Sequence, residues 1–453
     1  MADTTPVWAW LPGMAEPIEA ARLDVEAGRY RFRYGAAYKQ AGRDGGSVAL
    51  DPFQLRLNKQ ELRTDTLPGV LMDARPAGYG QDRLNAQWQA SYQRDLNDIE
   101  LLELGPADGV GAIEVCRDID RKRSWVAPDI DGLQHELERL EDDAPPSRAM
   151  RRANGDVGTS AGGERPKATF VFDRRLWLVK MQDRGDRQGM PALEYTVMSL
   201  ATQARLHTAP VLLRTVGPHQ VLLVERFDRS GDPRQPLRTL YASAHTVLQL
   251  PPAAVAGHPL RSYLVLADKL RVWGRDGGHD ALALQLQELW RRMAFNALVG
   301  NIDDHPRNHG LRYVDGAWRL TPAFDITPIW KPADSGRDGA PTLAMATGAD
   351  GLADASPERL LAAAGHFGLS PEEAADYLLQ TSRLIAGRWE ALLSEALAPL
   401  ASHRAGVSIA AIIDQARGAF SLSDSIVQAP AAVERAVEQL LSRPRSGRRR
   451  SRE

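Results

Sequence analysis

The stretch that most constrains this chain is Asn301-Ile-Asp303-Asp304-His305-Pro306-Arg307-Asn308, with Asp325 following seventeen residues after the last Asn. A kinase needs one carboxylate beside the attacking hydroxyl and two oxygen ligands that hold magnesium against the nucleotide phosphates. In protein kinases the base Asp lies five residues before the metal-binding Asn, and a second metal-binding Asp follows a short hairpin. Asp303, Asn308 and Asp325 have this spacing, with an Asp315-Gly316 turn between them. The pattern predicts a phosphoryl-transfer site.

Two other interpretations of the same residues stay open. Asp and Asn in a loop commonly do no more than cap turns. Alternatively, carboxylates and imidazoles could bind metal in a metallohydrolase, and the candidate ligands are Asp303, Asp304, His305, His309 and Asp325. The sequence offers no second cluster of histidines and carboxylates to complete a two-metal site, which counts against the metallohydrolase.

Composition sets the outer limits of what the chain can be. Its 453 residues, 43% of them hydrophobic, are enough for a large core and for two or three domains. There is no run of eighteen apolar residues, and the start Met-Ala-Asp-Thr-Thr-Pro lacks the pattern of a signal peptide. Cys116 is the single cysteine, so an internal disulfide is excluded. These features predict a cytoplasmic protein, and the formal net charge of −2 gives no overall attraction to nucleic acid or membrane.

Changes of pattern along the chain predict its domains. Residues 1–145 are rich in short alternating stretches and run into a polar, Pro- and Arg-containing linker at 142–155. A nucleotide-binding part is expected over 146–240 and a helical lobe with the catalytic loop over 241–435, where Ser356 and Ser370 are predicted N-caps. The basic tail, 436–453, is expected to be disordered, although its arginines could also contact phosphate non-specifically.

The part that precedes the helices contains residues suited to nucleotide binding. Gly162 and Gly163 lie in a Gly-rich loop before an alternating strand, and glycines let backbone amides approach phosphate closely. A second strand ends in Lys180, where a kinase has its phosphate-pairing lysine, and Glu194 could orient that lysine. An ordinary turn, an edge-strand lysine and a glutamate that favours the helix dipole are the alternatives.

A hairpin then ends in Val224-Glu-Arg-Phe-Asp-Arg229, at the position of the hinge between kinase lobes. Taken with the segments 160–167, 301–308 and 321–325, this motif resembles the HipA-type serine/threonine kinases, which are bacterial toxin kinases. The resemblance extends over nearly the whole chain. It implies an α+β, bilobal protein-kinase-like fold with a small strand-rich N-terminal domain and a helical C-terminal lobe.

The resemblance also implies roles for individual residues. Asp303 matches the catalytic base, and Asn308 and Asp325 match the magnesium ligands. The residues expected to contact ATP are Gly162, Gly163, Glu164, Arg165, Pro166, Lys167, Lys180, Glu225, Phe227, His305, Arg307, Asn308, Phe324 and Asp325. Ser160 matches a loop serine that the family can autophosphorylate, which switches the kinase off. Gly163-Glu-Arg-Pro departs from the more frequent loop pattern, and Phe324 stands where Tyr is also common.

The expected function is therefore transfer of the γ-phosphoryl group of ATP, with Mg²⁺, to a serine or threonine of a bacterial protein. An aminoacyl-tRNA synthetase is one such target in the family. The expected partners are this protein substrate, a small helix-turn-helix antitoxin, and DNA through the antitoxin. A small-molecule or lipid kinase and a catalytically idle partner of a DNA-binding protein remain alternatives. The intact set of Asp303, Asn308, Asp325 and Lys180 counts against an idle protein.

Overall fold

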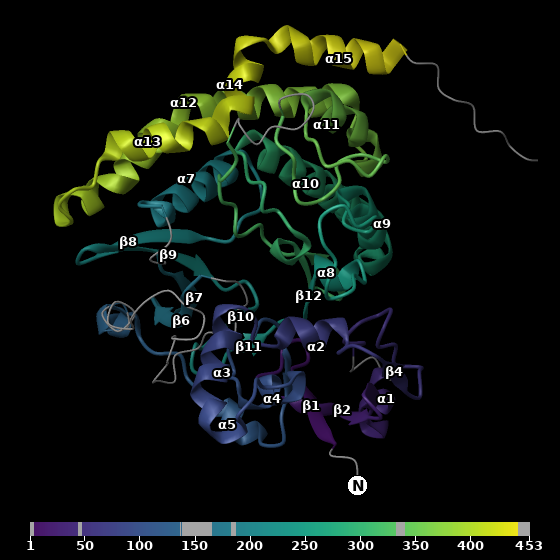
Figure 1. Cartoon of the computed structure of the whole chain (residues 1–453). Coiled ribbons are helices and arrows are strands. Elements are labelled where there is room, and N and C mark those ends of the chain that lie inside the picture. Colours follow the sequence, from purple (N-terminus) through teal and green to yellow (C-terminus); the bar gives the residue numbers. More distant parts are fainter. Residues whose placement is uncertain are drawn as a thin grey trace, which may run out of the picture.

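The computed structural model describes residues 4–43, 48–135, 137, 165–182, 187–331 and 340–442. Figure 1 shows the N-terminal region at one end of the molecule and the last helices at the other. Several sequence predictions lie outside the described residues: Ser160, Gly162, Gly163 and Glu164 of the Gly-rich loop, the linker at 142–155, and the arginine-rich end from residue 443.

The N-terminal region is built on a five-stranded antiparallel sheet with the strand order β4-β3-β2-β1-β5. Its strands are β1 (Thr5–Ala9), β2 (Ile18–Glu26), β3 (Arg29–Tyr34), β4 (Leu62–Thr64) and β5 (Ile113–Val115). Alternate residues of β1 are buried, as expected for a strand with one face in a core. The region also contains helices that the strand-rich prediction did not include: α1 (Ala36–Arg43), α2 (Gly69–Ala74), α3 (Tyr79–Tyr92), α4 (Asp98–Leu104) and α5 (Ile119–Arg123).

A second antiparallel sheet, with the order β6-β7-β9-β8, carries the expected nucleotide-binding strands. Its members are β6 (Lys167–Phe172), β7 (Arg175–Lys180), β8 (Val211–Val216) and β9 (His219–Glu225). Asp173 and Arg174 both have positive φ, at 48° and 55°, which gives the tight turn between β6 and β7. Helix α7 (Met190–Gln203) packs against β8 and β9 and on its other side against the long helix α12 (Pro371–His403).

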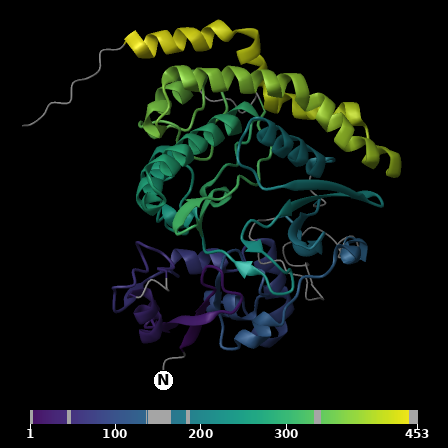
Figure 2. The same cartoon turned by 180° about the vertical axis from the view of Figure 1, so that it is seen from behind.

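The remaining lobe is mainly helical. Its other helices are α8 (Ala244–Val247), α9 (Tyr263–Trp273), α10 (His279–Leu298), α11 (Pro357–Ala364), α13 (Ile409–Arg417), α14 (Ser421–Gln428) and α15 (Pro430–Ser442). Its strands are the pair β10 (Arg229–Ser230) and β11 (Leu237–Arg238), and a sheet of β12 (Tyr241–Ser243), β13 (Gly310–Val314) and β14 (Ala317–Leu320). The turn between β13 and β14 lies at Asp315 and Gly316, as the sequence predicts. Figure 2 shows α12 running across the lobe, beyond the sheets.

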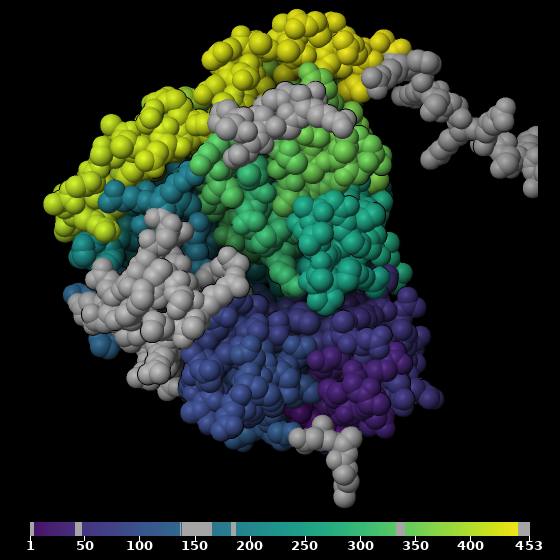
Figure 3. Space-filling model, viewed as in Figure 1, coloured from purple at the N-terminus to yellow at the C-terminus, as the bar shows by residue number. Residues whose placement is uncertain are grey.

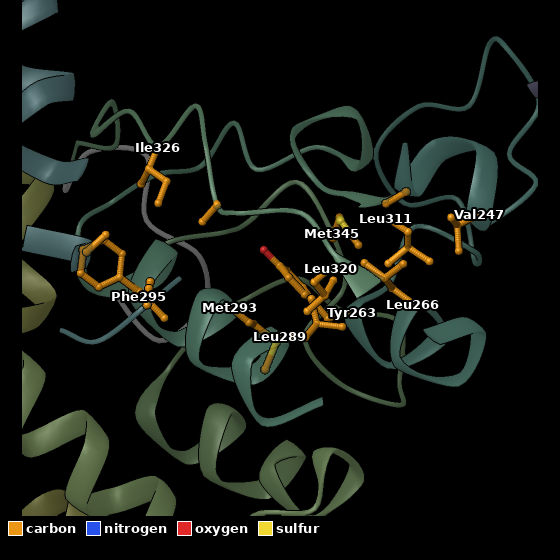
Figure 4. Close-up of a cluster of buried hydrophobic side chains, with 14 of the residues drawn as sticks. Val247, Tyr263, Leu266, Leu289, Met293, Phe295, Leu311, Leu320, Ile326 and Met345 are labelled. Atoms are coloured by element: carbon orange, nitrogen blue, oxygen red, sulfur yellow. The ribbon is translucent and has the colours of Figure 1, made fainter. Parts of the chain in front are cut away.

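The core of this lobe lies directly beneath the β13–β14 hairpin. Figure 4 shows side chains from α8, α9, α10, β13 and β14 gathered in one cluster, among them Tyr263, Met293 and Leu320. Tyr263 and Met293 are fully buried. Helix α10 and this cluster support the loop that joins α10 to β13, which is the segment with the kinase-like motif.

The C-terminal boundary differs from the prediction. Residues 436–442, expected to belong to the basic tail, continue helix α15. Val433, Ala436 and Val437 are buried at helical spacing, so this helix packs on the lobe instead of being a solvated end. Within the described residues, no helix is both long enough and apolar enough to cross a membrane.

Candidate active site

Lys180 is the last residue of β7 and forms the charged centre of the site. Its Nζ donates to Glu194 Oε1 of α7 at 2.5 Å and to Asp325 Oδ1 at 2.5 Å. Burial by itself would lower the pKa of Lys180, but the two carboxylates raise it above its ordinary value. Glu194, which the sequence suggests as the acidic partner of Lys180, forms an ion pair with it.

Asp325 lies just beyond β14 and has a left-handed backbone, with φ of 59°. Burial favours its neutral form, but Lys180 and Lys167 together lower its pKa below the ordinary value, so it is a carboxylate at neutral pH. Its side chain remains 35% exposed. Lys167, on β6, lies opposite Lys180 in the strand register, and burial lowers its pKa to about 8. A carboxylate therefore faces solvent among basic groups.

The loop from residue 301 to 308 begins where α10 ends. Gly300 turns the chain with φ of 62°, and the Asn301 amide N donates to the carbonyl of Asn296 at 2.8 Å. The Asp303 side chain is 62% exposed, with Oδ1 4.0 Å from His305 Nε2. Asn308 Nδ2 donates to the main-chain oxygen of Asp303 at 2.8 Å, which directs the Oδ1 of Asn308 away from that contact.

Asn308 and Asp325 line the same pocket. An amide oxygen and a carboxylate are ligands that suit Mg²⁺, which commonly takes few protein ligands and completes its shell with phosphate and water. Among the described residues, no group of three or more His, Cys, Asp or Glu is arranged to hold a metal. The donor set therefore fits a magnesium ion bound together with nucleotide phosphates.

Asp304 and His309, considered above as possible metal ligands, are instead buried beneath the loop. Asp304 accepts hydrogen bonds from the Tyr263 hydroxyl at 2.5 Å and from the Ala344 amide at 2.6 Å. The same hydroxyl lies 3.2 Å from His309 Nε2 and accepts from Asn296 Nδ2 at 3.0 Å. Burial raises the pKa of Asp304 to about 7 and lowers that of His309 to about 3. These contacts count against a metallohydrolase site.

The two expected hinge residues, Phe227 and Glu225, lie in different surroundings. The Phe227 ring lies 5.4 Å from that of Phe324 and 6.0 Å from that of Tyr241, so an aromatic group borders Asp325. The carboxylate of Glu225, by contrast, accepts from Arg175 Nη1 at 2.8 Å on the sheet. An apolar face next to charged groups suits a nucleoside phosphate.

The residues before β6 and inside the loop are placed as follows. Pro166 joins the sheet, because its carbonyl accepts from the Met181 amide at 3.0 Å. Arg165 lines a different pocket from Asn308 and Asp325, together with Arg187, Gln188 and Ile412. Arg307 Nη1 lies 3.8 Å from Asp73 Oδ1, a residue of the N-terminal region.

One buried ionic cluster was missed by sequence reasoning. Asp228 Oδ2 accepts from Arg226 at 2.8 Å, from Arg229 at 2.7 Å and from the Gly111 amide at 2.7 Å. Arg226 and Arg229 also donate to the carbonyl of Gly109. The sequence signal that could have revealed this cluster is the alternation of charges in the Arg-Phe-Asp-Arg motif, since charged side chains that are buried require partners. The cluster joins the segment after β9 to the N-terminal region.

Two HipA domain models match this chain. The HipA N-terminal domain profile matches residues 14–116, and the HipA-like C-terminal domain profile matches residues 159–389. No curated protein matches the sequence.

Among solved structures, HipA in the Shewanella oneidensis MR-1 complex of HipA, HipB and operator DNA is similar, with 17% identity and a TM-score of 0.63. The match covers 95% of this chain and 99% of that chain. The Helicobacter pylori proinflammatory kinase CtkA matches with 14% identity over 60% of this chain and 95% of that chain. Its TM-score is 0.38. The predicted α+β, bilobal kinase-like fold and the HipA-type resemblance are confirmed.

Proposed function

This chain belongs to the HipA family, and we propose that it transfers the γ-phosphoryl group of ATP to a serine or threonine of a protein. The observation that carries the proposal is the pairing of Lys180 with both Glu194 and Asp325. A lysine held by a helix glutamate next to the metal-binding aspartate is the arrangement that an active protein kinase requires. The Asp303 to Asn308 loop lies beside it.

Each residue has a chemical task in this reaction. Lys180, oriented by Glu194, pairs with nucleotide phosphate, while the Phe227 and Phe324 rings supply an apolar face for the base. Magnesium, held by Asn308 and Asp325 when bound, neutralises phosphate charge. The acceptor hydroxyl oxygen forms a bond to the γ-phosphorus as the bond to the β–γ bridging oxygen breaks, and its electron pair leaves with ADP. The exposed Asp303 carboxylate takes the hydroxyl proton.

The proposal includes partners. The similar Shewanella structure contains HipB and operator DNA, and we extend a small DNA-binding antitoxin, and DNA contacted through it, to this chain. The protein substrate is a cytoplasmic one, for which an aminoacyl-tRNA synthetase is the first candidate. Co-purification with the product of a neighbouring helix-turn-helix gene tests the antitoxin, and phosphosite mapping in a lysate tests the substrate.

Asp303→Asn tests the reaction itself. Labelled phosphate from ATP should enter protein serine or threonine in a bacterial lysate with the wild type, and chelation of Mg²⁺ should stop it. Asp303→Asn should abolish transfer and leave Mg-ATP binding measurable, because the base positions the acceptor and contributes little to nucleotide binding.

Asp315→Asn is the matched control, since that exposed turn residue has φ of 50° and Asn tolerates this conformation. It should transfer phosphate as the wild type does. Label in metabolites or lipids instead of protein would favour the small-molecule or lipid kinase. No incorporation by the wild type would favour the idle partner, and full activity of Asp303→Asn would refute the role of Asp303.

A further inference from the structure

A carboxylate from the N-terminal region is buried against the lobe that carries the catalytic loop. Asp73 lies on α2, and its side chain is only 3% exposed. It accepts hydrogen bonds from the Ser243 amide at 2.8 Å, from Ser243 Oγ at 2.7 Å and from Thr246 Oγ1 at 2.8 Å. All three donors belong to the corner where β12 passes into α8, so the contact joins two parts of the chain that are 170 residues apart.

The same corner holds the end of the catalytic loop. Ser243 pairs with Gly310 in the β12–β13 ladder, and the Ala244 amide donates to the carbonyl of His309 at 2.8 Å. Arg307, inside the loop, reaches back to within 3.8 Å of Asp73 Oδ1. Asp73 is therefore linked to both sides of Asn308, through Arg307 and through the β12–α8 corner.

The backbone of α2 also packs closely against the side chain of Thr246. A Cβ on Gly69 of α2 would lie 2.6 Å from Thr246 Cγ2, closer than packed atoms allow. Figure 3 shows the N-terminal region meeting the rest of the molecule along a continuous boundary. Burying a carboxylate here is costly, and an apolar pair would stabilise such a boundary equally well. The directed hydrogen bonds of Asp73 add a fixed geometry that apolar packing does not.

We propose that Asp73 is a positioning residue for phosphoryl transfer, which holds the catalytic loop in place through the β12–α8 corner and Arg307. This inference rests on the proposed kinase function. Asp73 contacts no substrate; it restrains the segment between Asp303 and His309, and a displacement of ~1 Å in such a segment can cost ~10²-fold in rate. The N-terminal region would then be part of the active-site scaffold.

Asp73→Asn tests the inference with two measurements. The amide keeps the size of the carboxylate but removes its charge and replaces one acceptor oxygen by a donor. The ion pair with Arg307 is lost, and Ser243 Oγ, which donates to Asp73 Oδ1, has to accept instead. Hydrogen exchange of the backbone amides at 303–309 should become faster. The kcat for transfer to protein should fall at least about tenfold with the KM for ATP within about twofold, since the nucleotide contacts are left in place.

Asp98→Asn is the matched control. Asp98 accepts from the Tyr30 hydroxyl at 2.7 Å and from Arg75 at 2.7 Å, and both partners lie within the N-terminal region. This variant should lose stability without faster exchange at 303–309 and without a change in kcat. If Asp73→Asn does not fold, Thr246→Val removes one donor to Asp73 with little change in shape and should give the same pattern to a smaller extent.

Each outcome decides the inference. Unchanged exchange at 303–309 in Asp73→Asn, or faster exchange with unchanged kcat, would overturn it, as would equal effects in Asp98→Asn. The exchange measurement needs no catalysis. A wild type without transfer activity would thus refute the proposed function, while the exchange data would still show whether Asp73 holds the loop.

Discussion

At the scale of single residues, Asp304 and His309 share the Tyr263 hydroxyl and respond to pH in opposite directions. Burial raises the pKa of Asp304 from 3.8 to about 7, so the stability it contributes is present at low pH and is lost as pH rises through 7. Burial lowers the pKa of His309 from 6.5 to about 3, so its contribution is present above pH 6.5 and is lost as pH falls towards 3. Between about pH 4 and 6.5 the two contributions oppose each other.

In Asp304→Asn, the pH dependence of stability that comes from His309 should no longer be offset by Asp304. The free energy of unfolding of this variant should rise with pH more steeply than that of the wild type between about pH 4 and 6.5, by up to roughly 1 kcal/mol per pH unit. Urea denaturation across this pH range measures the free energy of unfolding. His309→Asn should change the slope in the opposite direction, and equal slopes in all three proteins would contradict the assignment.

Ser160 carries a second prediction at this scale, which follows from the family resemblance of the Gly-rich loop. Phosphate on Ser160 would add a charge of about −1.5 to −2 where ATP phosphates must bind, so transfer activity should fall. Incubation with Mg-ATP and mass spectrometry should locate phosphate on Ser160. Ser160→Asp should be less active than Ser160→Ala. An unmodified Ser160 together with a fully active Ser160→Asp variant would contradict the prediction.

At the scale of elements, the end of α10 decides where the loop of residues 301–308 starts. Gly300 has φ of 62°, and a Cβ there would lie 2.6 Å from the carbonyl oxygen of Ala419. Its own carbonyl accepts from the amides of Ile329 at 3.0 Å and Trp330 at 2.9 Å. This glycine therefore ties α10 to the segment that follows Asp325.

Gly300→Ala should destabilise the protein by at least about 2 kcal/mol, because the left-handed backbone and the clash both penalise a side chain. Transfer activity should fall as the loop shifts. Gly368→Ala is the control: its φ is 80°, but no atom lies within 4 Å of the added Cβ, so only the backbone penalty applies. Thermal denaturation and initial rates of phosphate transfer should be measured for both variants. Equal losses of stability and activity would show that the close approach to Ala419 is unimportant.

At the scale of the whole molecule, the buried cluster of Arg226, Asp228 and Arg229 joins the segment after β9 to the N-terminal region. Arg226 and Arg229 lower the pKa of Asp228 despite its burial, so Asp228 is a carboxylate at neutral pH. Removal of one member of a buried ion pair leaves an uncompensated charge, at a cost of roughly 3–5 kcal/mol. Asp228→Asn should therefore lower the unfolding temperature strongly and separate the N-terminal region into an earlier calorimetric transition.

Asp350→Asn is the comparison for that variant. Asp350 makes two hydrogen bonds with Arg359, at 2.7 and 2.9 Å, but its side chain is 50% exposed. Asp350→Asn should lower the free energy of unfolding by less than about 1 kcal/mol, as for other surface ion pairs. A single transition of unchanged temperature in Asp228→Asn would show that the cluster does not couple the two regions.

The sequence by itself determined the features that depend on neighbours along the chain. The hairpin turn at Asp315 and the N-caps Ser356 and Ser370 were predictable, because turns and caps are made by residues within a few positions of each other. The fold class followed from the family resemblance of the motifs. The spacing of Asp303 and Asn308 belongs to the same class, since one short loop carries both.

Only the tertiary structure decided which distant groups meet. The sequence did not show that Asp304 and His309 lie beneath the loop, that Asp73 reaches Ser243, or that α15 continues through residues 436–442. A polar residue has the same local pattern whether it faces solvent or a buried partner, and its environment is set by packing between remote segments. The Lys180–Asp325 contact spans 145 residues, so the motif supplied the candidates and the fold brought them together.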